Sequence, residues 1–201
     1  MKLLVIGERS GVVRNAFSSR GHYAVSCDLV GSDLPGKHYI ADAFEMVRFN
    51  WDIIIAHPPC TYLANSGVKH LYTDPKRIYL MLQARQFFMA LWRLPVKKLC
   101  LENPVPHHFA ELPAYSQIIN PYDFGHPVSK RTCLYLRGLP PLLPTFCGYK
   151  SDRYCKPSGK TNGSTWYNNP PGKGSLSVRR SRTFEGVALA MANQWGCLVK
   201  P

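Results

Sequence analysis

Short apolar runs alternate with helical stretches along most of this chain, and this alternation restricts the fold more than any other feature. Each run is a few residues long and is bounded by charges, Gly or Pro, as buried parallel strands usually are. The alternation predicts an α/β protein with an open, mostly parallel sheet covered by helices, and with ligands at the carboxyl ends of the strands. The runs span residues 3–6, 23–25, 53–55 and 99–101, and the main helical stretches span 12–19, 77–94 and 184–195.

Length and composition fit one well-packed domain. The chain has 201 residues, 45% of them hydrophobic, and no apolar stretch approaches the roughly 18 residues that span a bilayer. Glu8 and Arg9 interrupt the N-terminal run, which argues against a signal peptide. Seven widely spaced cysteines form neither a disulfide framework nor a zinc motif. We therefore expect reduced thiols, a cytoplasmic (reducing) compartment, and no membrane or metal partner.

The charge of the chain points to a polyanionic partner. The formal net charge is +13, and an excess of Lys and Arg attracts nucleic acid at long range and binds it by counterion release. In residues 144–182, where Gly, Pro, Asn and Ser are frequent, eight Lys/Arg accompany the single acid Asp152. The predicted organisation is a core at 1–143, this basic region at 144–182, and a helix at 183–201 that returns to the core.

The basic region predicts contacts with nucleic acid. Its aromatic residues show neither the helix nor the strand period that would bury them, so they are available to stack on bases while the cations follow phosphates. The alternative is a solvated basic loop. The candidate nucleic-acid-binding residues are Lys150, Arg153, Lys156, Lys160, Trp166, Lys173, Arg179 and Arg180.

Two short motifs at predicted strand ends carry the candidate chemistry. Pro58-Pro59-Cys60 directly follows a buried strand, so the thiol of Cys60 stands on a rigid turn where a nucleophile is expected. Glu102-Asn103-Pro104 closes the next predicted strand, so the carboxyl of Glu102 can face the thiol. Either motif alone would more often be structural, as a space-filling cysteine or a strand-ending turn. Together they indicate a nucleophile with an acid beside it.

The pair resembles the motifs of the cytosine-C5 DNA methyltransferase family, whose nucleophile lies in a Pro-Cys motif and whose acid follows in a Glu-Asn-Val motif. The match extends over most of the chain. Ser129-Lys130-Arg131 leads into an apolar strand like the family's arginine motif, and Arg182-Thr183-Phe184 introduces a helix like its last motif. The resemblance implies a Rossmann-like class I methyltransferase fold with a catalytic core at 1–143. It also implies S-adenosyl-L-methionine as cofactor and DNA, duplex or single-stranded, as substrate.

The resemblance assigns roles to individual residues. Cys60 would add to C6 of cytosine, Glu102 would hold a proton at N3, and Arg131 would contact the base at O2. We read His57 as a turn histidine hydrogen-bonded to backbone, outside the catalytic set, although either His57 or Arg131 could lower the pKa of the Cys60 thiol. The implied cofactor-binding residues are Glu8, Arg9, Ser10, Gly11, Asp28, Asp42 and Pro58.

Several departures from the family leave other functions open. The first loop, 8–14, is poor in glycine, His57 stands where glycine is usual, and residues 144–180 are all that represents the family's large target-recognition region. One alternative is C5 modification of a cytidine nucleotide. Another is a nucleic-acid-binding protein that has kept the fold and lost turnover. The small size resembles the accessory enzymes of phages and mobile elements.

Overall fold

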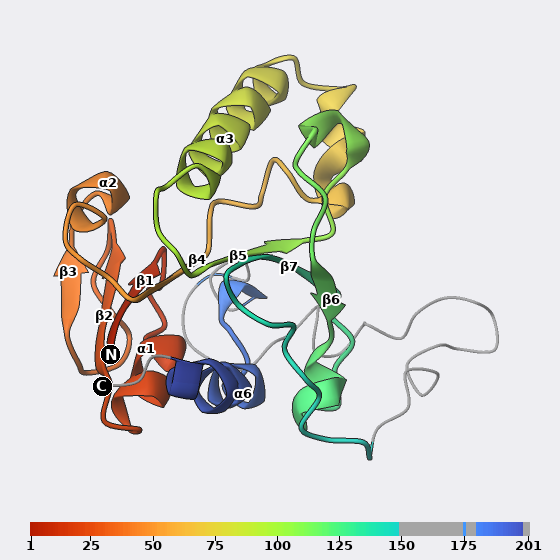
Figure 1. Ribbon diagram of the computed structural model, residues 1–201. Coiled ribbons are helices and arrows are strands. Elements are labelled where there is room, and N and C mark those ends of the chain that lie inside the picture. The colour runs from red at the N-terminus through yellow and green to blue at the C-terminus, as the bar shows by residue number, and fades with distance from the viewer. Residues whose placement is uncertain (149–174, 176–179, 199–201) are drawn as a thin grey trace.

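The computed structural model describes residues 1–148, 175 and 180–198, and these residues form a seven-stranded sheet flanked by helices (Figure 1). The strand order is β3-β2-β1-β4-β5-β7-β6. Neighbours from β3 to β5 pair in parallel, whereas β7 is antiparallel to both β5 and β6. The strands are β1 (Lys2–Ile6), β2 (Tyr23–Asp28), β3 (His38–Ile40), β4 (Ile53–Ala56), β5 (Leu99–Pro104), β6 (Gln117–Ile119) and β7 (Thr132–Arg137).

This sheet confirms the predicted α/β class. An open sheet of this order, with β7 reversed between β5 and β6, is that of the Rossmann-like class I methyltransferase fold. Two strands, β3 and β6, lie at the edges and are three residues long. The sequence did not predict them, because three residues are too few to show a period.

Helices cover both faces of the sheet, as Figure 1 shows: α3 and α2 lie on one side, and α1 and α6 on the other. Leu3 and Val5 of β1 pack on the side of α6, whereas Leu4 and Ile6 pack on the side of α3. A strand covered on both faces must be apolar throughout, which explains the continuous apolar runs. The helices are α1 (Val12–Ser18), α2 (Ala43–Met46), α3 (Lys76–Trp92) and α6 (Glu185–Trp195), with 3₁₀ turns η1 (Asn65–Leu71), η2 (His108–Ala110), η3 (Pro121–Phe124) and η5 (Gly196–Leu198).

The helix ends follow local chemistry. Helix α3 stops at Trp92, two residues before the predicted end, because Pro95 disfavours a helical conformation at Leu94.

Helix α6 packs against α1. Its last residue, Trp195, is fully buried, and the indole N–H donates to the carbonyl of Pro140 at 3.1 Å. No helix within the described ranges has the length and apolarity to cross a bilayer.

Strand β5 extends further than its neighbour β4, and the candidate site lies along this extension. The last residue of β4, Ala56, pairs with Leu101 of β5. Beyond that point β5 continues through Glu102 to Pro104, paired only with β7. The tripeptide 102–104, which we expected to close a strand ending at residue 101, therefore lies within the strand itself. The chain that leaves β4 passes over the open edge of this extension.

A buried arginine ties α1 to the loop that precedes β3. Arg14 is fully buried, and its guanidinium donates to the hydroxyls of Ser26 and Ser32 and to the carbonyls of Leu34 and Pro35 at 2.8 to 3.2 Å. These bonds hold the strand β2 and the following loop in a fixed position relative to the first helix. A buried donor with so many acceptors is a structural element whose removal leaves several polar groups unsatisfied.

We expect Arg14→Ala to lower the free energy of unfolding by about 3 kcal/mol or more, because buried hydroxyls and carbonyls would lose their donor. Urea denaturation followed by circular dichroism measures the change. Arg48→Ala, at an exposed position, is the matched control and should stay within about 0.5 kcal/mol of the wild type. Equal transition midpoints for the two variants would contradict the structural role of Arg14.

Candidate active site

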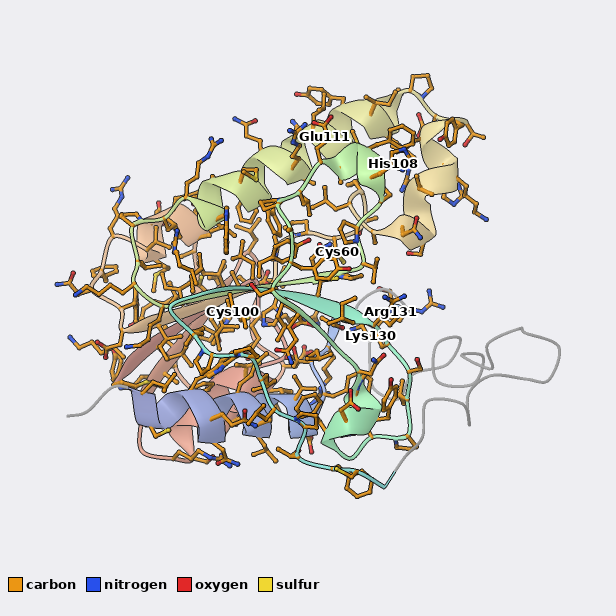
Figure 2. The ribbon with its side chains drawn as sticks, turned by 45° about the vertical axis from the view of Figure 1, so that its right-hand side comes forward. Cys60, Cys100, His108, Glu111, Lys130 and Arg131 are labelled. Atoms are coloured by element: carbon orange, nitrogen blue, oxygen red, sulfur yellow. The ribbon has the colours of Figure 1, made fainter. Side chains whose placement is uncertain are left out.

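The thiol of Cys60 lies just beyond the carboxyl end of β4. Residues 57–59 carry the chain off the sheet, and the carbonyl of Cys60 accepts the backbone N–H groups of Leu63 and Ala64 at 3.0 and 2.9 Å. The side chain is partly buried and free of any disulfide. Figure 2 shows Cys60 between the segment that carries His108 and the segment that carries Lys130 and Arg131. A turn closed by two hydrogen bonds fixes the direction of the thiol.

Glu102 forms an ion pair with His57 across the step between β4 and β5. The Nδ1 atom of His57 lies 2.8 Å from Oε2 of Glu102, and the side chains keep only 15% and 14% of their surface exposed. Burial disfavours both charges. The attraction between them outweighs this effect, so the pKa of His57 is raised and the pKa of Glu102 is lowered. Each group therefore stabilises the charged form of the other.

This contact corrects the interpretation of His57 as a turn histidine bonded to backbone. The residue directly follows β4, and β5 extends beyond β4 at that height, so the imidazole meets a side chain instead of a backbone group. The only signal in the sequence was the position of a titratable residue beside a proline turn. That position also suits a structural histidine, and the sequence alone could not choose between the two.

Lys130, and not Arg131, is the cation that acts on the Cys60–Glu102 pair. The ammonium of Lys130 lowers the pKa of both Cys60 and Glu102. It also donates to the carbonyl of Arg180 at 2.9 Å. Arg131 is exposed, and its charge acts on the thiol of Cys133, whose pKa burial raises to about 11.

The pKa of the Cys60 thiol is raised. Burial is the largest cause, and the nearby carboxylate of Glu102 adds to it, while Lys130 and a backbone hydrogen bond act in the opposite direction. Neither His57 nor Arg131, the two cations that the sequence offered for this role, contributes. The thiol is thus largely protonated at neutral pH, and its reactivity depends on Lys130.

A pocket of about 530 Å³ opens beside His57 and suits a nucleoside. It lies over the carboxyl ends of β1, β2 and β4, where open parallel sheets bind ligands. Asp28 and Asp42 can accept hydrogen bonds from hydroxyl or amino groups, and the ring of Phe87 offers an apolar wall. Nε2 of His57 is buried without a hydrogen-bond partner among the described residues. The lining residues are Ile6, Gly7, Cys27, Asp28, Leu29, Ala41, Asp42, Ala43, His57, Pro59, Tyr62, Leu80, Gln83, Ala84 and Phe87.

The first loop, which precedes helix α1, stabilises the N-terminus of that helix. The carboxylate of Glu8 is 3% exposed and accepts the backbone N–H groups of Val13 and Arg14, at 2.5 and 3.1 Å. Burial raises the pKa of Glu8, against the opposing effects of the His57 charge and these two hydrogen bonds. The carboxylate thus occupies the N-terminus of α1, which is where an anionic ligand would otherwise bind.

The remaining predicted cofactor residues do not line the pocket. Arg9 forms an exposed ion pair with Asp33 at 2.9 Å, and the hydroxyl of Ser10 accepts the N–H of Val12 at 3.4 Å. Gly11 adopts φ 72 at the start of α1. Pro58 is buried, and its neighbour Pro59 supplies the pocket wall. Asp28 and Asp42 are the members of the predicted set that the pocket includes.

The predicted nucleic-acid contacts fall largely outside the described residues. Arg180 is described and lies beside the site through its bond to Lys130. Within the parts of the chain that the structure describes, no cluster of three or more His, Cys, Asp or Glu could hold a metal ion. The predicted contacts that lie outside the described residues are Lys150, Arg153, Lys156, Lys160, Trp166, Lys173 and Arg179.

Alkylation of Cys60 tests the electrostatics of the site. Lys130→Met removes a neighbouring cation, so the pKa of the thiol should rise and its alkylation curve should move to higher pH. Glu102→Gln removes a neighbouring anion, so the curve should move to lower pH. The measurement is the rate of iodoacetamide labelling of the Cys60 peptide by mass spectrometry across a pH series.

Arg131→Met is the matched control, since its charge does not contribute to the pKa of Cys60. The exposed thiols of Cys147 and Cys197 serve as internal references in the same digest. An alkylation curve that moves with Arg131→Met and stays in place with Lys130→Met would contradict this assignment and show that Arg131 is the cation that lowers the pKa of Cys60.

Comparisons with known proteins give distant structural likenesses alone. No protein-family model and no curated protein matches the chain. The solved structures that resemble this chain include three methyltransferases. They are a prophage-encoded E. coli protein described as a DNA modification methyltransferase (13% identity, TM-score 0.44), Entamoeba histolytica methyltransferase EhMeth (17% identity, TM-score 0.44) and S. pombe Dnmt2 methyltransferase (15% identity, TM-score 0.39). The matches cover 68%, 79% and 86% of this chain and, in the same order, 46%, 63% and 56% of the solved chains. This chain thus spans less than two thirds of the length of each structure.

Proposed function

We propose that this chain transfers a methyl group from S-adenosyl-L-methionine to C5 of cytosine in DNA. One observation carries the proposal: Cys60 and Glu102 lie at the ends of neighbouring strands, and a pocket suited to a nucleoside opens beside them on the same edge of the sheet. A nucleophile, an acid and a cofactor pocket at one sheet edge are the parts that this reaction needs.

The chemistry explains why a thiol is required. C5 of cytosine is too weak a nucleophile to attack a methyl donor directly. Once the Cys60 thiol has released its proton to solvent, addition of the thiolate to C6 places the electron pair of the C5–C6 double bond in the ring and makes C5 an enamine carbon. C5 would then take the methyl group as the bond between that methyl group and the donor sulfur breaks, and the donor would leave as a neutral thioether. Solvent would accept the C5 proton, and N3 would return its proton to Glu102 as the double bond re-forms and the Cys60 sulfur leaves.

The His57–Glu102 pair can supply the proton that this addition needs. Negative charge that enters the ring is relieved when N3 is protonated. The charge of His57 favours the ionised form of Glu102, and Nδ1 of His57 lies 2.8 Å from Oε2 of that carboxyl group. When His57 carries a proton on Nδ1, Glu102 can take this proton and then give it to N3, which leaves His57 neutral. In this role Glu102 contacts the base. His57 is a positioning residue that supplies Glu102 with the proton.

The cofactor pocket supports the choice of donor. When bound, S-adenosylmethionine supplies an electrophilic methyl group on a sulfonium. Asp28 and Asp42 would hold its ribose and adenine, Pro59 and Phe87 would exclude water, and Nε2 of His57 would face it. The first loop (Glu8, Arg9, Ser10, Gly11) and Pro58 would fix the shape of the pocket from behind.

The cations around the site would hold the substrate. Arg131 is exposed next to Lys130, and we propose that it contacts O2 of a base that enters from solvent. We also propose that the basic region 144–182 follows the phosphates of DNA, with residues 1–143 as the catalytic core and 183–201 returning to it. Arg180, bonded through its carbonyl to Lys130, would connect the two parts.

Transfer of a labelled methyl group tests the proposed reaction. We expect label from S-adenosylmethionine on cytosine C5 of single-stranded DNA, with less on duplex DNA because extruding a paired base costs a few kcal/mol. Cys60→Ser should lower the rate at least about 1,000-fold, and Glu102→Gln about 100-fold. Cys197→Ser removes an exposed thiol and should retain the wild-type rate. 5-Fluorocytosine in the strand should trap a covalent complex at Cys60, since C5 then has no proton to lose.

Label on cytidine monophosphate and not on DNA would show that the substrate is a nucleotide, and the proposed chemistry at Cys60 would be unchanged. No label on DNA, on single strands or on nucleotides would overturn the proposed reaction, and salt-sensitive DNA binding without S-adenosylmethionine binding would identify a protein that has lost turnover.

The pH dependence of methyl transfer tests the role of His57. Burial lowers the pKa of His57, but the charge of Glu102 outweighs burial and raises it from its ordinary value, so the pair should lose its proton only as the pH rises through that raised value. In His57→Gln the proton must reside on Glu102 alone, whose ordinary pKa is 4.5. The alkaline limb of kcat should therefore move to lower pH. An unchanged pH profile with a reduced rate would mean that His57 only shapes the site.

A further inference from the structure

The two segments that follow Cys60 and Glu102 are joined into one unit. An isolated antiparallel bridge pairs Ala64 with Pro106. The N–H of Asn65 donates to the carbonyl of Val105 at 2.9 Å, and the N–H of His107 donates to that of Leu63 at 3.0 Å. Because each segment begins at a candidate catalytic residue, the unit that they form stands directly beside the site, as the place of His108 near Cys60 in Figure 2 illustrates.

This unit displays aromatic rings to solvent. Tyr72 is 72% exposed and Phe109 is 40% exposed, and their ring centroids lie 6.1 Å apart in an edge-to-face arrangement. The imidazole of His108 lies 3.7 Å from the ring of Phe109. Single exposed aromatic residues are common, but three rings in contact at the surface are not explained by core packing. We call Tyr72, His108 and Phe109 the aromatic platform.

The platform rests on a rigid base. Leu63 and Ala110 are fully buried beneath it, and His107 is 3% exposed, with Nε2 within 2.9 Å of the carbonyl of Tyr62. An ion pair of 2.6 Å joins Glu111, directly after η2, to Arg85 of α3. Rings held by a fixed base lose little conformational entropy when a ligand stacks on them, which favours binding.

The charges around the platform favour a polyanion. Lys69 and His70 lie in the last turn of η1, and Lys76 begins α3; all three are exposed. Two acids lie in the same stretch: Glu111 is paired with Arg85, and the carboxylate of Asp74 accepts the backbone N–H of Lys76 at 3.0 Å. Aromatic rings beside exposed cations are the combination that binds single-stranded nucleic acid, with bases on the rings and phosphates on the cations.

We propose that the aromatic platform stacks bases of single-stranded DNA next to the base held at Cys60. The proposal rests on the proposed function in placing the target cytosine at Cys60. Tyr72 and Phe109 are the stacking residues, and Lys69 and Lys76 follow the phosphates. The platform adds a contact surface to the basic region 144–182 and gives the site a preference for an unpaired strand, whose flanking bases have their faces open.

Binding of a short fluorescent single-stranded oligonucleotide, followed by anisotropy with the full chain and without cofactor, tests the proposal. Tyr72→Ala and Phe109→Ala should each weaken binding about ten-fold, in the range found for loss of one base–aromatic stack. Tyr72→Trp should restore it. The matched controls are Tyr39→Ala on β3 and Phe49→Ala, which remove rings of 50% and 64% exposure outside the platform and should bind as the wild type does.

An oligonucleotide of the same length with abasic sugars separates stacking from charge. On this probe the wild type and Tyr72→Ala should bind equally, because no base remains to stack. Equal affinity of the platform variants and the wild type for the normal strand would overturn the proposal, and so would an equal loss in the controls or on the abasic probe. Because the assay needs no turnover, platform-dependent binding without methyl transfer would count against the proposed reaction alone, and methylation of single strands with no platform dependence would count against the platform alone.

Discussion

The candidate site depends on one constraint, the unequal length of two paired strands. Strand β4 ends at Ala56, opposite Leu101, while β5 continues to Pro104 because β7 pairs with it on the other side. The extension carries Glu102 beyond the last residue of β4. Had the strands ended together, Glu102 would have lain in a mobile turn. The offset instead fixes its carboxylate on a paired strand, where His57 can reach it.

Four ionisable groups whose charges alternate in sign lie near the point where β5 extends beyond β4. Glu8 acts on His57, His57 pairs with Glu102, and Lys130 acts on Glu102. Each charge is partly or wholly buried, and an isolated ion there would be strongly disfavoured. Alternation lets each group stabilise its neighbours, so the pKa of His57 is raised and that of Glu102 is lowered despite their burial. It also connects the side of the sheet edge where His57 lines the pocket to the side where Cys60 lies.

Much of the fold could be predicted from the sequence, because it follows from patterns along one segment. The apolar runs located β1, β2, β4 and β5, and strand order placed the Cys60 and Glu102 motifs at one sheet edge. What escaped prediction depends on contacts between segments. The partner of His57 follows from how far β5 extends beyond β4. That Lys130 acts on Cys60 while Arg131 acts on Cys133 follows from the segments packed around them. Neither is encoded locally.

The first loop illustrates how a departure in sequence changes the physics of a site. A glycine-rich loop leaves the N–H groups of the following helix free to bind a ligand. Here the carboxylate of Glu8 takes two of these groups, from Val13 and Arg14. An anionic ligand group at that position would meet a buried side chain whose raised pKa already reflects the cost of placing charge there. The polar groups that line the pocket include Asp28, Asp42 and the imidazole of His57. His57, the residue before the two prolines, thus uses one ring both to line the pocket and to contact the carboxyl group of Glu102.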